Sequence, residues 1–515
     1  MPLTSPNLID QLLADQQSLT AVERFSQIHD REESPAQEKY YKDLIPLSKP
    51  GKGEQYAFEV DLDACTGCKA CVVACHSLNG LDDNESWRDV GMISGGSTAA
   101  PFQQTVTTAC HHCEDPACMN GCPTLAYEKD EKTGIVRHLD DQCIGCQYCM
   151  LKCPYDVPKY NDDLGIVRKC DMCYDRLKVG EAPACVQSCP SGAIKIKVIK
   201  QKAEAKETRM IAGVFNSDYT KPTTTFRRKT PLPDNMSAAD AENLTPEHAH
   251  LPLVWMLTLT QTGAGLFTLS ALFQFIQAPV SATTYLWMAV IGTIFAIIGI
   301  GSSILHLGSP LGAWRAFLGL RRSWLSREIV VFGAWPPLAM LLIAVLYFKL
   351  DAWQLPVTIA CCAISLLGVY CSVMVYADTR RDFWRLDRTL ARFFGNLLIG
   401  GTAITLAIFS LTSQPHPAIL HLTLGLGALL RITVESLSLL PARQSHWSFA
   451  KKSALVQLVS LRTPLILRWL CLFAGLAIIV FTPVIGALVL LTGEWLARYL
   501  FFRAVAAPKM PGSRE

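Results

Sequence analysis

The feature that most constrains this chain is a run of four closely spaced cysteines near residue 150. Spaced x2, x2 and x3 and followed by a proline, they are Cys143, Cys146, Cys149 and Cys153. This spacing is typical of loops that wrap a [4Fe–4S] cluster and pass the fourth cysteine to a neighbouring cluster. Gly145 lets the backbone adopt a positive φ and aim free N–H groups at sulfur. The run therefore predicts a domain whose core is formed by iron–sulfur clusters.

Three further groups of four cysteines lie in the same part of the chain. The first group is Cys65, Cys68, Cys71 and Cys75, and the second is Cys110, Cys113, Cys118 and Cys122. The run described above is the third group, and the fourth is Cys170, Cys173, Cys185 and Cys189. Groups one and three are alike, as are groups two and four, which a duplicated two-cluster ferredoxin would leave behind. Sixteen cysteines at four per cluster predict four [4Fe–4S] clusters.

Disulfides and structural zinc are the competing uses of these cysteines. Residues 1–33 contain neither the apolar segment of a secretory signal nor a twin arginine, which argues against an oxidising compartment. Structural zinc usually takes two Cys-x-x-Cys pairs per ion, and groups spaced x2, x2, x3 fit that rule poorly. The spacing favours iron–sulfur clusters, without which residues 57–200 should not fold.

The apolar residues, half of the chain, are unevenly distributed. Residues 1–250 are rich in charge, proline and cysteine, whereas residues 251–505 form long apolar runs with arginine-rich breaks. We expect an α+β duplicated bacterial-ferredoxin-like domain, followed by an all-α polytopic membrane domain. The net charge of +3 indicates little by itself, and we expect no nucleic-acid partner.

Five segments follow from this pattern. They are an N-terminal extension (1–56), a four-cluster ferredoxin-like domain (57–200), a linker (201–250), a membrane anchor (251–505) and a C-terminal tail (506–515). The extension is either a strap on the protein or a partner, or a disordered arm. Short strands are predicted around the cysteine groups, at 55–60, 134–138, 165–168 and 193–199.

Eight membrane helices are predicted in the second half. Their approximate ranges are 251–277, 284–305, 328–348, 353–376, 394–412, 416–440, 464–481 and 484–503. Only Thr482 and Pro483 separate the last two, but about twenty residues already span a bilayer, so one long helix is disfavoured.

The loops between these helices carry strongly unequal charge. The loops after helices two, four and six, together with the tail, hold sixteen cations: Arg315, Arg321, Arg322, Arg327, Arg380, Arg381, Arg385, Arg388, Arg392, Arg443, Lys451, Lys452, Arg462, Arg503, Lys509 and Arg514. The opposite loops hold only Lys349. The positive-inside rule therefore places both termini, and the ferredoxin-like domain, on the cytoplasmic side of a bacterial inner membrane. The alternative is the periplasmic side, if a partner exported with its own signal overrides the charge distribution.

Two ionisable residues at the membrane edge are candidates for a quinol site. His306 ends the second helix and Glu328 begins the third. Quinol oxidation needs two proton acceptors and a hydrogen-bond partner for each ring oxygen, which an imidazole and a carboxylate supply. The alternative is a helix cap together with an ion pair to Arg327 or Arg315.

Other polar residues of the spans have simpler interpretations. Arg431 with Glu435, and Glu494 with Arg498, are spaced i, i+4 and predict internal ion pairs, with proton exit as the alternative. Histidines suited to haem ligation are few, His421 being one within a span, so we expect no haem. The remaining cysteines should act as small apolar residues: Cys361, Cys362, Cys371 and Cys471.

With these residues in view, the chain resembles a fusion of two subunits of the dimethyl sulfoxide reductase family. The four cysteine groups resemble its four-cluster electron-transfer subunit, and residues 251–505 resemble its eight-helix anchor. The anchor likeness rests on His306-Leu-Gly-Ser-Pro, Ser326-Arg-Glu-Ile329 and Gly493-Glu-Trp-Leu-Ala-Arg-Tyr499. The resemblance implies a haem-free anchor that oxidises menaquinol at His306 and Glu328, and a separate molybdopterin-containing catalytic subunit.

The resemblance also implies how cysteines of different groups share clusters. Cys189 would join Cys65, Cys68 and Cys71, and Cys75 would join Cys170, Cys173 and Cys185. Cys153 would join Cys110, Cys113 and Cys118, and Cys122 would join Cys143, Cys146 and Cys149.

The chain departs from that family in two respects. The family usually has separate chains, whereas here one polypeptide holds both parts. Its export-facing arrangement also conflicts with the positive-inside count, which leaves the terminal substrate open. Two other functions remain: a dehydrogenase subunit that reduces quinone through the same relay, and a metal-bearing membrane sensor or transporter without electron flow.

Overall fold

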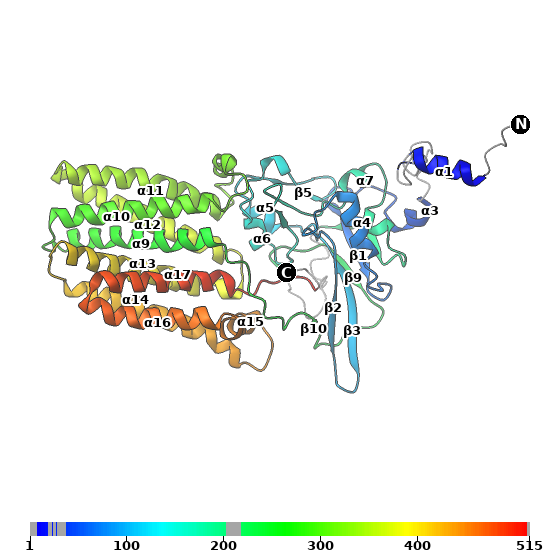
Figure 1. Cartoon of the computed structure of the whole chain (residues 1–515). Helices are drawn as coiled ribbons and strands as arrows, with labels where there is room; N and C mark the ends of the chain where they lie inside the picture. The colour runs from blue at the N-terminus through cyan, green and yellow to red at the C-terminus, as the bar shows by residue number, and fades with distance from the viewer. Residues whose placement is uncertain (1–7, 19–22, 24–26, 28–37, 202–217, 512–515) are drawn as a thin grey trace, which may run out of the picture.

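The computed structural model describes residues 8–18, 23, 27, 38–201 and 218–511. Figure 1 shows a bundle of long helices at one end and a smaller domain of strands, loops and short helices at the other. Of the expected extension, the structure describes α1 (Leu8–Ser18) and the segment that begins with α3 (Glu38–Tyr41) and η1 (Lys42–Leu44). The rest of residues 1–37, and residues 202–217 of the linker, lie outside the described residues.

The strands predicted around the cysteine groups are present in the smaller domain. β1 (Glu54–Asp61) lies between β8 (Ile194–Lys200), which is antiparallel to it, and β9 (Thr225–Arg227), which is parallel. Two short hairpins join β4 (Tyr127–Lys129) to β5 (Val136–His138), and β6 (Lys159–Asn161) to β7 (Ile166–Arg168).

A longer hairpin was not predicted from the sequence. β2 (Asp89–Gly96) pairs with β3 (Pro101–Thr108), and β10 (Ser237–Ala238) adds a short third strand. Figure 1 shows this hairpin extending from the domain. Ile93 and Val106 are buried against Val60 and Met236, which ties the base of the hairpin to the central sheet.

Short helices lie beside the cysteines. They are α4 (Ala70–Asn79), α5 (Ala117–Gly121), α6 (Tyr148–Lys152), α7 (Tyr174–Lys178) and α8 (Ala184–Gln187), with the turn η2 (Asp140–Gln142) before the third group. Such short helices are marginal alone, and here buried cysteines such as Cys71, Cys149 and Cys185 lie within them.

The eight predicted membrane helices are confirmed: the described part of the chain holds eight helices long and apolar enough to cross a membrane. They are α9 (Leu251–Phe275), α10 (Ala282–Ile304), α11 (Trp324–Tyr347), α12 (Asp351–Ala377), α13 (Leu386–Leu411), α14 (Ala418–Leu439), α16 (Arg462–Phe481) and α17 (Pro483–Arg503). The non-spanning segments beside them are η3 (Pro310–Phe317), η4 (Asp382–Trp384), η5 (Leu440–Arg443), α15 (Phe449–Leu455) and η6 (Val456–Ser460).

One helix begins well before its predicted start. α13 begins at Leu386 rather than near residue 394, so Arg388 and Arg392, counted above as loop cations, are helical. Arg392 is buried and donates a hydrogen bond to the carbonyl of Phe383 at 2.8 Å. Hydropathy placed the boundary too late because it treats an arginine with an internal partner like one in water.

Small residues let the central helices approach closely. α9 packs against α10, α12, α13 and α17. A Cβ on Gly265 of α9 would lie 2.3 Å from the carbonyl oxygen of Leu397 and 2.7 Å from the Cα of Gly401, both on α13. Close contact between small residues is the usual way for helices to associate in a bilayer, where apolar side chains gain little from avoiding lipid.

The arginine-rich face of the bundle contacts the smaller domain. The loop after α10 donates a backbone hydrogen bond from Ser309 to Ile144, and the loop before α11 donates one from Gly319 to Pro123. Lys152 of α6 forms an ion pair with Asp378, just beyond α12, at 2.6 Å. The loops that carry most of the cations are therefore the ones that hold the ferredoxin-like part.

The C-terminal tail also returns to the smaller domain. The tail first passes α15, where the amide of Ala506 donates to Ser453, and Lys509 then forms an ion pair with Asp240 at 3.1 Å. Met510 is buried in the apolar cluster that contains Tyr56 and Phe58.

Candidate iron–sulfur sites and membrane site

The four cysteine groups share one backbone feature. The residue two positions after the first cysteine of each group has a positive φ: Gly67 (72°), His112 (39°), Gly145 (66°) and Met172 (61°). A positive φ is uncommon for residues other than glycine, so its recurrence at equivalent positions indicates a requirement of the loop. The sequence revealed it only where glycine occupies the position.

This turn directs backbone N–H groups at sulfur. The amides of His112, Gly145 and Met172 lie 3.5, 3.4 and 3.4 Å from the Sγ atoms of Cys110, Cys143 and Cys170. After the fourth cysteines, the amides of Ala126 and Ala193 lie 3.2 and 3.3 Å from the Sγ atoms of Cys122 and Cys189. N–H donors of this kind stabilise the thiolate form that binds iron and tune cluster potentials.

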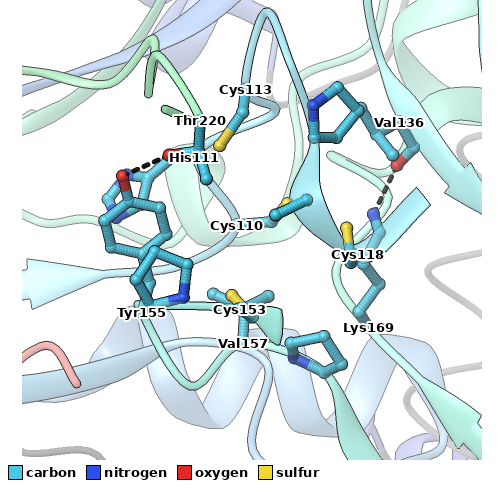
Figure 2. Close-up of a pocket in the computed structure, with 14 residues that line it drawn as sticks. Cys110, His111, Cys113, Cys118, Val136, Cys153, Tyr155, Val157, Lys169 and Thr220 are labelled. Atoms are coloured by element: carbon cyan, nitrogen blue, oxygen red, sulfur yellow. Dashed lines mark hydrogen bonds between the residues drawn. The ribbon is translucent and has the colours of Figure 1, made fainter. Parts of the chain in front are cut away.

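Cysteines from different groups meet in space. Figure 2 shows one hollow, lined by Cys110, Cys113, Cys118 and Cys153. A second is lined by Cys65, Cys68, Cys71 and Cys189. Each contains three cysteines of one group and the last cysteine of another, as in the sharing that the resemblance implied.

The cysteines of the other two sets also lie near one another, as the interactions between their charges show. Cys75 lies close enough to Cys185 and Cys173 to interact with their charges. Cys149 likewise lies close enough to Cys146, Cys122 and Cys143 to interact with their charges. The donor set fits four-thiolate iron–sulfur clusters in all four places, and such clusters would supply one-electron redox chemistry when bound.

Two buried cations lie among these cysteines and were missed from the sequence. Arg88 lies over the ring of Phe58 at 4.6 Å and donates to Thr107 at 3.2 Å, near Cys71 and Cys185. Lys169, seen in Figure 2, donates to the carbonyls of Val136 and Cys170. A buried cation requires a compensating anion, and clusters with four thiolate ligands are negatively charged.

The candidate histidine of the membrane edge lies in a row of imidazoles. The ring centroid of His306, in the loop after α10, is 5.0 Å from that of His250, which in turn is 4.8 Å from His248. Burial, reinforced by His248, lowers the pKa of His306 to about 4. Burial lowers the pKa of His250 to about 3, and the neighbouring His306, His248 and Arg381 act in the same direction. Both imidazoles are therefore neutral near pH 7.

Glu328 is buried in the first turns of α11 and accepts a hydrogen bond from Ser372 of α12. No hydrogen bond or ring contact joins Glu328 to His306, although the structure describes both residues. The ion pairs considered as the alternative are also absent from the described residues: Arg327 donates to the carbonyls of Leu320 and Arg321, and Arg315 donates to that of Asp141. Glu328 is thus a buried carboxylate with a neutral partner.

Tyr148 links this part of the membrane domain to the third cysteine group. It lies between Cys146 and Cys149 in sequence, and its hydroxyl donates to the carbonyl of Val375 in α12 at 2.8 Å. Burial, together with the nearby charges of Asp378 and Glu328, raises the pKa of Tyr148 well above its usual value. The third group therefore lies against the helix that holds the partner of Glu328.

The predicted ion pairs inside the spans are half right. Arg431 pairs with Glu435 at 2.8 Å, as its spacing indicated. Glu494 pairs instead with Arg468 at 2.8 Å, and Arg498 donates to Gln261 and to the carbonyl of Arg392. The partners of Glu494 and Arg498 lie on other helices, which sequence spacing does not reveal.

Fold and site together define a membrane-anchored iron–sulfur electron-transfer protein. A family model described as a 4Fe–4S dicluster domain matches residues 102–199, and one described as the DMSO reductase anchor subunit (DmsC) matches residues 246–503. The chain therefore belongs to the dimethyl sulfoxide reductase family, with the iron–sulfur and anchor parts fused in one polypeptide.

Individual relatives match the first part. The B subunit of the anaerobic dimethyl sulfoxide reductase of Escherichia coli (strain K12) is 38% identical over 177 residues, 33% of this chain and 86% of the relative. The iron–sulfur subunit of the nitrate-inducible formate dehydrogenase of the same strain is 34% identical over 202 residues, 33% of this chain and 68% of the relative. The chain is a multi-pass membrane subunit of a molybdopterin oxidoreductase complex.

Proposed function

We propose that this subunit oxidises menaquinol in the membrane and passes the electrons through four [4Fe–4S] clusters to a separate molybdopterin-containing catalytic subunit. The contact between the third cysteine group and the membrane loops carries the proposal. A Cβ on Gly308 would lie 1.9 Å from the carbonyl oxygen of Gly165, and one on Gly145 would lie 2.9 Å from the amide nitrogen of Gly308. Gly308 is two residues from His306, so a cluster held by this group would lie beside the membrane edge.

The proximity of the cysteine sets supports one order of electron transfer. The set that faces the membrane loops contains Cys122, Cys143, Cys146 and Cys149. Tyr127 lies close to Cys149 of this set and to Cys118 of the set shown in Figure 2. Cys170 lies close to Cys110 of the Figure 2 set and to Cys75. The set of Cys75, Cys170, Cys173 and Cys185 would therefore come next in the relay. The remaining set is Cys65, Cys68, Cys71 and Cys189. It contains Cys68, the one exposed cysteine of the sixteen, all of which lie in described ranges. Electrons would leave near Cys68.

The residues at the membrane edge fit the proton chemistry of quinol oxidation. His306 is neutral and half-buried, so its imidazole can accept a hydrogen bond or a proton from a quinol hydroxyl. Glu328 could accept the second proton, since Ser372 is a neutral partner and leaves the carboxylate able to change its protonation state. Because the two side chains do not touch, a quinol ring would lie between them.

The charge distribution supports a cytoplasmic ferredoxin-like part on a bacterial inner membrane. The loops of the arginine-rich face, including Arg315 and Arg381, donate hydrogen bonds to residues 141 and 150 of the ferredoxin-like part. By the positive-inside rule this face is cytoplasmic. We also propose that the anchor binds no haem, because its spans contain few histidines.

Anaerobic reduction of the clusters by a menaquinol analogue tests this function. The full chain should contain about sixteen iron atoms, and its cluster absorbance should bleach when menadiol is added. Glu328→Gln should slow this reduction about 100-fold or more, within the usual range for loss of a proton-transfer group. Glu242→Gln, on an exposed residue of the linker, is the matched control and should leave the rate unchanged.

The same measurement separates the other functions. A fully loaded protein whose clusters stay oxidised with menadiol, yet reoxidise with menadione after dithionite reduction, would carry electrons in the opposite direction. No response to either compound would leave a sensor or transporter, and a full rate in Glu328→Gln would remove this residue from the site.

A further inference from the structure

A second polar cluster is buried inside the membrane bundle. Four arginines and two glutamates from four spans contribute to it: Arg392, Arg431, Arg468, Arg498, Glu435 and Glu494. The arginines and Glu494 are each at most 4% exposed. Charged groups in a bilayer are costly unless paired, so this arrangement requires an explanation.

The charges of this cluster do not balance. The two glutamates pair with Arg431 and Arg468: Glu435 at 2.8 and 3.2 Å, and Glu494 at 3.3 and 2.8 Å. Among the described residues, Arg392 and Arg498 form no ion pair and hydrogen bond only to neutral groups, although the charges of Glu435 and Asp387 lie near Arg392 and that of Glu494 near Arg498. Arginine cannot lose its proton under ordinary conditions, so four arginines against two glutamates leave the cluster with a net charge of +2.

The neutral partners of these two arginines are carbonyls, an amide and aromatic rings. Arg392 donates to the carbonyl of Phe383 and lies over its ring at 4.0 Å. Arg498 donates to the carbonyl of Arg392 at 2.8 Å and to the side-chain carbonyl of Gln261, and lies over the ring of Phe393 at 4.1 Å. These contacts reduce the burial cost but add no negative charge.

Hydrogen-bond donors next to the excess charge also lack partners. Among the described residues, Nε of Arg498, Nε2 of Gln261 and Nη1 of Arg468 are buried and make no hydrogen bond. Arg498 and Gln261 touch one another, so their free donors belong to one place, between α17 and α9. Buried donors are nearly always satisfied in native proteins.

We propose that a small inorganic anion, with chloride as the representative, binds beside Arg498 and Gln261 inside the bundle. Water would satisfy the free donors but would leave the excess charge in place. An anion does both, and the hydrogen-bond and ring contacts given above for Arg498 and Gln261 include neither His306 nor Glu328. The site would bind a structural ion that holds α9, α13 and α17 together.

Chloride dependence of thermal unfolding tests the proposal on the full, cluster-loaded chain in lipid nanodiscs. Gluconate replaces chloride at constant ionic strength, so general screening stays fixed. We expect the unfolding midpoint of the membrane domain to rise with chloride and then to saturate, as linkage to one binding site requires. In crystals soaked in bromide, an anomalous peak should appear beside Arg498.

Gln261→Glu gives a sharper test, because it places a carboxylate of nearly the same shape beside Arg498. This variant should unfold at a higher temperature than wild type without chloride, and it should lose both the chloride response and the bromide peak. The control is Gln274→Glu, at the C-terminal end of α9, where Gln274 donates to Thr358 at 3.0 Å. The control should retain the wild-type chloride response even if it lowers the midpoint.

Two results would overturn the proposal. A wild-type midpoint independent of chloride, with no bromide peak, would mean that water alone fills the site. A chloride response as large in Gln261→Glu as in wild type would place any bound anion elsewhere.

Discussion

At the scale of single residues, the contact between the two parts depends on glycine. Gly145, Gly165 and Gly308 bring three backbones together so closely that any Cβ would overlap a neighbouring main-chain atom. A side chain at any of these positions would separate the third cysteine group from the loop that carries His306. Sequence reasoning had identified Gly145 for its φ alone, since a contact 163 residues away along the chain leaves no local pattern.

Gly308→Ala should therefore uncouple the two parts. Its Cβ would meet the carbonyl of Gly165 at 1.9 Å, so the backbones must move apart. We expect normal iron content but at least a tenfold slower reduction of the clusters by menadiol, because electron transfer is sensitive to distance. Gly301→Ala, in α10 with no atom within 4 Å of the added Cβ, is the control. Equal rates in the two variants would show that the glycine contact does not position the cluster.

The partly buried histidines His250 and His306 make stability depend on pH. The folded-state pKa of His250 is about 3 and that of His306 about 4, below the value of about 6.5 of an unfolded histidine. The unfolded chain therefore binds more protons, and the stability present above about pH 6.5 is lost as pH falls towards these folded-state values.

Acidification from pH 7.5 to pH 5 should consequently lower the unfolding midpoint. His250→Asn keeps a residue that tolerates the left-handed backbone found here (φ 44°) and removes one titrating group. Its loss of stability over this pH range should be smaller by on the order of 1 kcal/mol. An unchanged pH dependence would mean that His250 is as accessible to protons in the folded protein as in the unfolded chain.

At the scale of helices and strands, the sequence predicted what depends on local pattern. Hydropathy gave all eight spans, and the cysteine spacing gave the strands β1, β5, β7 and β8. Sequence patterns did not reveal the β2–β3 hairpin. Its glycines (Gly91, Gly95 and Gly96) interrupt the alternation of apolar and polar residues by which strands are recognised. Sequence patterns also missed the cations Arg88 and Lys169, because their burial follows from the cysteine sets around them.

The close contact of α9 with α13 leaves no room for a side chain at Gly265. Gly265→Leu should destabilise the membrane domain by about 3 kcal/mol or more, at the upper end of the usual cost of overpacking, since backbone atoms cannot move aside. Gly425→Leu, on α14 with open space around its Cβ, should have little effect. Unfolding in detergent, followed by circular dichroism, measures both. Similar midpoints would show that the α9–α13 contact yields easily.

At the scale of the whole molecule, the described part of the expected tail, residues 506–511, packs against the rest of the protein. Met510→Ala should destabilise the ferredoxin-like domain by about 2–5 kcal/mol, because the side chain is buried among its aromatic residues. Lys509→Ala removes a surface ion pair with Asp240 and should cost less than about 1 kcal/mol. Loss of cluster absorbance in denaturant measures both, and equal effects would show that the tail acts through its charge.

The linker and the returning tail give this chain two covalent crossings between its halves. A separate iron–sulfur subunit would have to find its anchor by diffusion, and its occupancy would vary with the amounts of each. Here every anchor is made with its own relay, at a local concentration set by tether length rather than by expression. Synthesis thus fixes the ratio of the two parts at one to one, so neither half can accumulate alone.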